Sequence, residues 1–321
     1  MRMNEIEQNQ ADDSSLNSSA PIFAVAAQPS YAHTLFMGPG GLRPGWGIAF
    51  YFLMFYGLQR LVGVWSESWE LGQLRSMMLE EMGSMLAAII PSLILARIER
   101  RPWRAYGLPL RDAFGKLFWA GALWGFAGIT ILVGSQYELH AFDFGHLVLH
   151  GARMAKFAAF WGLMFLLVGF FEEFLLRGYT QFTLTRGLGF WPAAVVLSSA
   201  FGFIHYWNGG EEWPGLLAAA AIGFFFCLTL RRTGSLWFAV GFHAAWDWGE
   251  TFFYSVPDSG TVFPGHLLSS SFRGPHWITG GSVGPEGSVL CFVVIGVSWL
   301  TFDRVYREAK YFPAEKDLET A

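Results

Sequence analysis

Long apolar stretches separated by short polar connections make up most of this chain. Eight of them stand out, at residues 44–65, 82–97, 115–136, 155–186, 190–208, 213–231, 234–254 and 287–303. A helix that crosses a membrane needs about 20 mostly apolar residues. The pattern therefore predicts an all-α, polytopic membrane protein with about eight transmembrane helices. The second and last stretches give the weakest signal, because their uncharged runs are the shortest.

Lysine and arginine gather in alternate connections. They are frequent after the second stretch and in the C-terminal tail, they recur after the fourth and sixth stretches, and the opposite connections hold few. Because positively charged loops stay in the cytoplasm, both termini are expected there. We expect a disordered cytoplasmic tail (1–44), a transmembrane domain (45–303) and a cytoplasmic C-terminal tail (304–321). The Gly/Pro-rich connection 255–286 falls on the non-cytoplasmic side, and its length predicts that it folds back over the bundle.

Composition supports a membrane environment. Of the 321 residues, 53% are hydrophobic and 14% are charged, whereas soluble domains carry about 25% charge. The net charge of -4 gives no reason to expect nucleic acid as a partner. The lipid bilayer is the expected surrounding, and a bacterial plasma (inner) membrane is the expected location. Cys227 and Cys291 lie in apolar runs and are expected to be free, buried thiols.

Charged side chains interrupt the fourth apolar stretch. Glu173 and Arg177 are four residues apart, so on a helix they face each other and can pair. Glu172 then points elsewhere and is available for chemistry. Because a charge deep in the bilayer is costly, such residues are candidates for function. The alternative is an ion pair at the membrane interface without a catalytic role.

Two more polar pairs have helical spacing, Phe201 with His205 and His243 with Asp247. Counted at 1.5 Å per residue from the cytoplasmic ends, Glu172, His205 and Asp247 lie about 20 to 22 Å deep. Three predicted helices thus bring polar groups to one level of the membrane, which favours a shared site. The alternatives are an interfacial histidine and a His–Asp pair that only satisfies itself. The histidines around Asp143 (140, 146 and 150) are expected on the surface.

These three motifs, in this order, resemble those of the CPBP (ABI) family, which includes type II CAAX prenyl endopeptidases and bacteriocin-processing or immunity proteins. The resemblance covers about residues 155–254, the motif-bearing half of the domain. It implies an eight-helix fold with a catalytic cavity inside the bundle, open to the cytoplasm, and hydrolysis of a peptide bond within the membrane.

The resemblance also implies roles for the motif residues. Glu172 would be the general base that activates water, assisted by His205. Glu173, Arg177 and Phe201 would support the geometry of the site. His243 and Asp247 would bind the oxyanion or the water. Asp247 stands where the eukaryotic CAAX enzymes have asparagine, and a carboxylate cannot donate a hydrogen bond unless it is protonated.

The cofactor requirement stays open at this point. Glu172, His205, His243 and Asp247 offer nitrogen and oxygen ligands suited to zinc with an open water position. The same groups could also run a metal-free reaction with a buried carboxylate as base. We favour the absence of an obligatory, tightly held metal, with zinc as the alternative.

The expected activity is that of an endopeptidase acting on a membrane-embedded or lipidated, CAAX-like peptide or protein. One alternative is a non-catalytic scaffold or immunity protein of the same fold. Another is a transporter or proton relay, which also uses buried Glu and His. Transporters often carry paired repeats with broken helices, and the sequence gives no sign of such repeats.

Overall fold

The computed structural model describes residues 31–38, 41–67 and 72–311. The chain divides into two compact units, residues 1–36 and 37–321. The described part of the first unit is helix α1 (Tyr31–Phe36). The site described below lies in the second unit.

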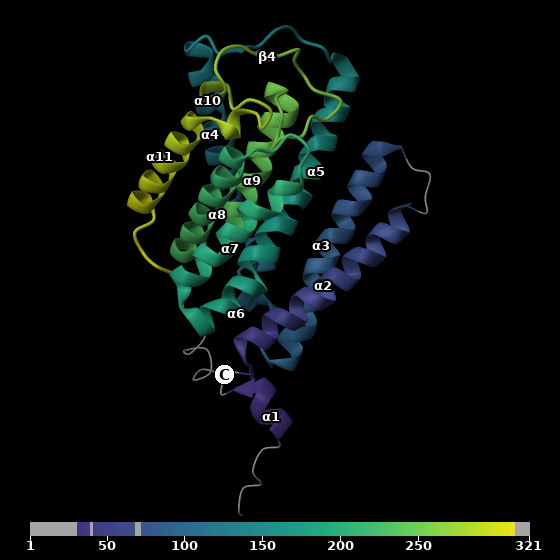
Figure 1. Ribbon diagram of the computed structural model, residues 1–321, viewed down its shortest axis with the longest axis vertical. Coiled ribbons are helices and arrows are strands. Elements are labelled where there is room, and N and C mark those ends of the chain that lie inside the picture. Colours follow the sequence, from purple (N-terminus) through teal and green to yellow (C-terminus); the bar gives the residue numbers. More distant parts are fainter. Residues whose placement is uncertain (1–30, 39–40, 68–71, 312–321) are drawn as a thin grey trace, which may run out of the picture. The chain divides into compact units, whose positions relative to one another are not determined.

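Helices fill most of the second unit (Figure 1). They are α2 (Pro44–Glu67), α3 (Gln73–Ile98), α4 (Lys116–Glu138), α5 (Gly151–Arg177), α6 (Tyr179–Leu188), α7 (Phe190–Ile204), α8 (Trp213–Thr233), α9 (Trp237–Trp248), α10 (His276–Thr279) and α11 (Val289–Val305). Two antiparallel pairs of two-residue strands accompany them, β1 (Met37–Gly38) with β2 (Gly41–Leu42) and β3 (Phe142–Asp143) with β4 (Ser271–Phe272). The predicted all-α class is confirmed.

Among the described residues, five helical segments are long and apolar enough to cross a membrane. These are Pro44–Ser66, Gln73–Ile98, Lys116–Glu138, Gly151–Leu188 and Trp213–Thr233. The chain is therefore a multi-pass membrane protein. The other three predicted spans correspond to α7, α9 and α11, which have 15, 12 and 17 residues. The count of eight stays a prediction, as does the orientation of the termini.

Two boundaries differ from the expected ones. The predicted segment 155–186 is two helices, because Gly178 between α5 and α6 leaves the helical conformation at φ -79°, ψ -124°. A side chain on Gly178 would meet the carbonyl of Phe174. In the predicted N-terminal tail, residues 31–42 carry α1 and the β1–β2 pair. Residues 1–30 and 312–321 of the predicted tails lie outside the described residues.

Glycines allow α9 to pack closely against α4. A side chain on Gly121 of α4 would meet the carbonyl of Phe238, and one on Gly125 would meet the carbonyl of Phe242. Helices in membranes commonly associate through small residues four apart, because these let the backbones approach. On its other side, α9 meets Gly169 of α5 in the same way. The backbone of α9, which carries two predicted site residues, is therefore held on both sides.

The core of the second unit is aromatic. Side chains from α8, α9 and α11 that are at most 1% exposed form one cluster with residues of α4. The cluster includes Phe225, Phe226, Phe238, Phe242 and Phe302. The connection between α9 and α11 crosses one end of the bundle, where β4 pairs with β3 between α4 and α5 (Figure 1). It thereby lies beside the C-terminal end of α9.

Candidate active site

The last turns of α5 carry the first motif. Arg177 Nη1 donates a hydrogen bond to Glu173 Oε1 at 3.0 Å, and neither side chain is exposed. The predicted pairing of these two residues is confirmed. The guanidinium lies over two rings, with its Cζ 4.6 Å from the centroid of Phe201 and 5.7 Å from that of Phe226. Gly223 makes room for it, since a side chain there would meet Arg177 Nη2.

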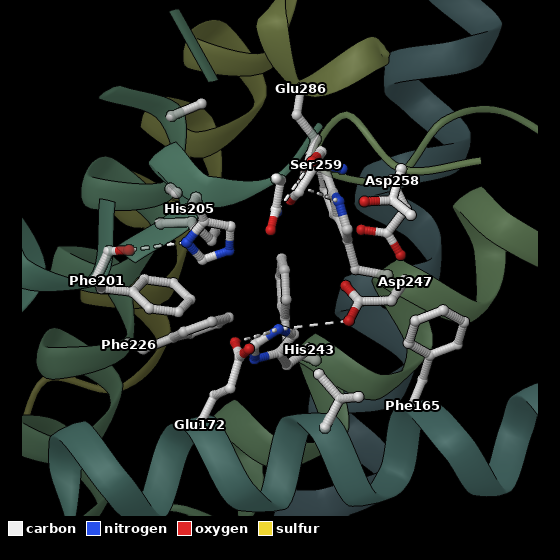
Figure 2. A pocket seen from close by; sticks show the side chains of 18 of the residues that line it. Phe165, Glu172, Phe201, His205, Phe226, His243, Asp247, Asp258, Ser259 and Glu286 are labelled. Carbon is white, nitrogen blue, oxygen red and sulfur yellow. Dashed lines mark hydrogen bonds and ion pairs between the residues drawn. The ribbon is translucent and has the colours of Figure 1, made fainter. Parts of the chain in front are cut away.

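His243 of α9 lies at the centre of the three motifs (Figure 2). Its Nδ1 is 3.2 Å from Glu173 Oε1. Its Nε2 is 3.5 Å from Glu172 Oε2 and 3.4 Å from Asp247 Oδ2. Both ring nitrogens therefore face carboxylate oxygens, so both protons of an imidazolium would have acceptors.

Glu172 is the carboxylate of the pair that reaches water. Its side chain is 21% exposed, whereas that of Glu173 is completely buried. The expected division of roles on α5, with one paired and one available carboxylate, agrees with this geometry. The break at Gly178 means that the depth of Glu172 could not be counted along one helix from Arg186. Even so, Glu172 and Asp247 meet at His243.

His205 begins a 3-10 turn (His205–Trp207) that continues α7. Its Nδ1 lies 2.8 Å from the carbonyl oxygen of Phe201. Because a carbonyl only accepts, Nδ1 carries a proton in this contact, and the neutral ring presents the lone pair of Nε2. The Phe201 ring stands edge-on to the imidazole, with ring centroids 4.8 Å apart. Phe201 thus fixes the orientation of His205 with its backbone and its ring.

A cavity of about 310 Å³ joins these groups. Glu172, His205, His243 and Asp247 all line it. Phe165, Phe201 and Phe226 contribute apolar walls, as Figure 2 shows. The structure therefore brings all four predicted catalytic residues to one cavity, from α5, α7 with its 3-10 turn, and α9.

Several residues that the sequence analysis did not select also line the cavity. Asp258, Ser259 and Glu286 come from the connection 255–286. Ser259 holds Glu286 in place, because its backbone N and its Oγ donate to Glu286 Oε2 at 3.1 and 2.7 Å. Glu81 of α3 is the fourth, and its Oε1 is buried without a hydrogen-bond partner among the described residues. The signal for Glu81 was an acidic residue at the start of an apolar run.

The ligand atoms of the four motif residues do not form a compact set. Among the described residues, the group of ligating atoms that lie within 4.8 Å of one another is Asp247, Glu250 and Asp258, and not the set Glu172, His205, His243 and Asp247. An all-oxygen set suits hard cations better than zinc, which takes nitrogen and sulfur ligands as well. The residues present therefore do not fit a zinc centre at the four motif positions.

The remaining candidates are placed as the sequence indicated. His140, His146 and His150 are exposed, and His146 Nδ1 lies 2.8 Å from Ser269 Oγ. Cys227 and Cys291 are free and buried. Glu250 is completely buried. It lies in the π-helical turn Gly249–Tyr254 that continues α9.

Comparison with known proteins gives one family match. Residues 154–249 match the family model described as type II CAAX prenyl endopeptidase Rce1-like. The matched segment contains all three motifs and ends before the connection 255–286. No curated protein matches the chain.

Proposed function

Since residues 154–249 are a type II CAAX prenyl endopeptidase Rce1-like domain, we propose that the chain is an intramembrane endopeptidase. It hydrolyses a peptide bond of a hydrophobic or lipidated, CAAX-like substrate with water activated by Glu172 and His205. The observation that carries this proposal is the meeting of two carboxylates and two imidazoles on one cavity with apolar walls. These groups supply bases and hydrogen-bond donors at one place inside a bundle of apolar helices.

Glu172 is the general base. Of the three carboxylates that contact His243, it is the most exposed, at 21% against 9% for Asp247 and 0% for Glu173. A water between Glu172 and His205 would meet two acceptors, the Glu172 carboxylate and the His205 Nε2. Glu172 takes one proton as the water attacks the carbonyl carbon, and it returns that proton to the leaving amine as the C–N bond breaks, while His205 Nε2 holds the water in place.

His243 stabilises the oxyanion. When doubly protonated, it presents its Nε2 proton to the oxygen of a substrate carbonyl that enters the cavity beside Glu172 and Asp247. Such preorganised donors contribute strongly where charge develops in the transition state. Glu173 holds the other nitrogen at 3.2 Å and so fixes the ring. Asp247 orients the ring from the Nε2 side. This role needs only an acceptor, which removes the difficulty of a carboxylate acting as oxyanion donor.

The substrate is a peptide that reaches the cavity from the bilayer. The phenylalanines that line the cavity suit an apolar segment or a lipid-modified residue better than a charged one. Hydrophobic burial is the dominant favourable term in such an association. A prenyl group and a plain hydrophobic side chain share this chemistry, so the experiment must distinguish them.

The test compares purified protein, reconstituted in liposomes, on two peptides that share a CAAX-like sequence, one farnesylated and one unmodified. Products are identified by mass spectrometry. Glu172→Gln should lose about 10²-fold or more in rate. Glu138→Gln, at the exposed end of α4, makes the same charge change away from the cavity and should leave the rate unchanged.

A second arm tests activity on natural substrates. Membrane-protein termini are compared between cells that carry the wild-type chain and cells that carry Glu172→Gln. If termini and peptides are unchanged while the variant remains folded, the endopeptidase is rejected in favour of the non-catalytic scaffold. Cleavage of the farnesylated peptide alone would assign a prenylated substrate.

A further inference from the structure

Three carboxylates meet next to the cavity, and two of them, Asp247 and Asp258, also line it. Asp247 belongs to α9, Glu250 to the π-helical turn that follows, and Asp258 to the connection 255–286. Each offers one oxygen, and the three oxygens lie within 4.8 Å of one another. Figure 2 shows Asp247 and Asp258 side by side. Acidic side chains from α9, from the π-helical turn and from the connection 255–286 thus lie close together.

These carboxylates lack a cationic partner that would explain their closeness. Asp247 is 6% exposed and Glu250 is completely buried. Among the described residues, the ion pairs reach this group only through His243, which lies 3.4 Å from Asp247. Thr251 Oγ1 donates to Asp258 Oδ2 at 3.0 Å, which accounts for one of its oxygens.

Glu250 supplies an independent sign of a ligand. Both of its carboxylate oxygens are buried, and neither has a hydrogen-bond partner among the described residues. A buried ionised carboxylate is costly unless it is paired, hydrogen-bonded or bound to a metal. The π-helical turn places it here, and such turns occur frequently at functional sites. The Glu250 carboxylate therefore lacks a partner among the described residues.

We propose that Asp247, Glu250 and Asp258 bind a divalent cation, and that this cation is calcium. The ligands are all oxygens, which is the preference of hard cations. Calcium–oxygen bonds are about 2.4 Å long, so oxygens on opposite sides of the ion lie about 4.8 Å apart. The three oxygens lie within this limit and can therefore share one calcium ion. Glu286 stands next to the group but is held by Trp246 and Ser259.

The cation fastens the connection 255–286 to the end of α9. Asp247 lies in α9 and Glu250 in the turn that follows it, whereas Asp258 lies inside the connection. Asp247 belongs both to the proposed calcium site and to the proposed active site, because it also contacts His243. The proposal concerns binding and does not depend on the proposed endopeptidase activity.

The test uses the full chain, purified in detergent, stripped with a chelator and desalted. Calcium chloride alone is added in steps while the melting temperature is followed, and binding is measured by calorimetry. We expect one calcium per chain and a saturable rise in melting temperature. Magnesium should produce a smaller rise, because it demands near-octahedral geometry, whereas calcium accepts irregular sets of oxygen ligands.

Glu250→Gln and Asp258→Asn should abolish the calcium-dependent rise, and Glu138→Gln should retain it. Without calcium, Glu250→Gln should melt no lower than the wild type, because the change removes a buried uncompensated charge. That comparison separates loss of the site from loss of folding. The proposal is overturned if calcium leaves the wild type unchanged, if both site variants keep the shift, or if zinc gives a larger shift than calcium.

Discussion

Glu173 Oε1 accepts a hydrogen bond from Arg177 at 3.0 Å and also lies 3.2 Å from His243 Nδ1. One carboxylate oxygen thus connects a buried cation on its own helix with the imidazole of another helix. Two nitrogens of Arg177, Nε and Nη2, have no hydrogen-bond partner within the part of the chain that the structure describes, and the Phe201 ring lies beneath the guanidinium. The pair is therefore connected to both histidines of the proposed active site, through Glu173 to His243 and through Phe201 to His205.

Breaking this pair should lower stability as well as activity. Arg177→Met leaves Glu173 buried without its cation, and removing one partner of a buried ion pair costs about 3–5 kcal/mol. We expect a loss of that size in the free energy of unfolding, measured by denaturant titration in micelles. The double variant Glu173→Gln/Arg177→Met should recover much of the stability but not the activity, because His243 loses its carboxylate. A single variant as stable as the wild type would contradict this account.

Asp247 should tolerate asparagine better than alanine. The amide oxygen of Asp247→Asn can still accept a hydrogen bond from His243 Nε2, whereas alanine removes the acceptor. We expect Asp247→Ala to lose about tenfold more in kcat than Asp247→Asn, with KM little changed, because the residue acts through His243 and does not bind the substrate. Equal losses for the two variants in the liposome assay would argue for a direct catalytic role of the carboxylate.

The carboxyl group of Glu211, in the connection before α8, should make the free energy of unfolding depend on pH. Burial is the main cause that raises the pKa of Glu211 from 4.5 to about 7. Glu211 lies in the connection before α8, and Gly215 leaves room for its carboxyl. Because the folded state binds this proton more tightly than the unfolded state, stability falls as pH rises from about 4.5 to about 7 and then levels off.

Glu211→Gln should remove this part of the pH dependence. The measurement is the difference in unfolding midpoint between the wild type and the variant, at about pH 4 and about pH 8, on either side of the transition. Glu138→Gln, at the exposed end of α4 and away from Glu211, is the control and should keep the wild-type slope. A slope that is the same in all three proteins would show that Glu211 titrates as an ordinary carboxyl.

The local parts of the site could be predicted from the sequence. The pairing of Glu173 with Arg177 and of His243 with Asp247 follows from the helical repeat, because residues four apart share a face. The convergence of Glu172, His205 and Asp247 was also expected from their depth. The break at Gly178 was missed, although a glycine directly after a basic residue is a common helix end.

Which residues of the connection 255–286 line the cavity could not be predicted. Asp258 and Glu286 reach the cavity by an irregular path, for which the sequence has no periodic signal. Glu81 lines the cavity because α3 packs against α5, and this tertiary contact has no signal in the sequence. The sequence also gives no signal for the π-helical turn that buries Glu250. Helical periodicity determines which residues share a face, and packing determines which faces meet.

Two glycines of α4 give a matched test of the packing that holds α9. In Gly125→Ala the new methyl group would meet the carbonyl of Phe242, next to His243, so the helices must separate. Gly134 lies in the same helix with open space around it. We expect Gly125→Ala to destabilise by about 1–3 kcal/mol, as overpacking does. Gly134→Ala should stabilise by about 0.5–1 kcal/mol, because alanine favours the helix.

Unfolding in micelles measures both effects, and peptide cleavage shows whether α9 has moved. Because α9 carries His243 and Asp247, the Gly125 variant should lose activity under conditions in which it is still folded. The Gly134 variant should keep full activity. If both alanine variants behaved alike, close packing of α4 on α9 would not be what positions the two residues.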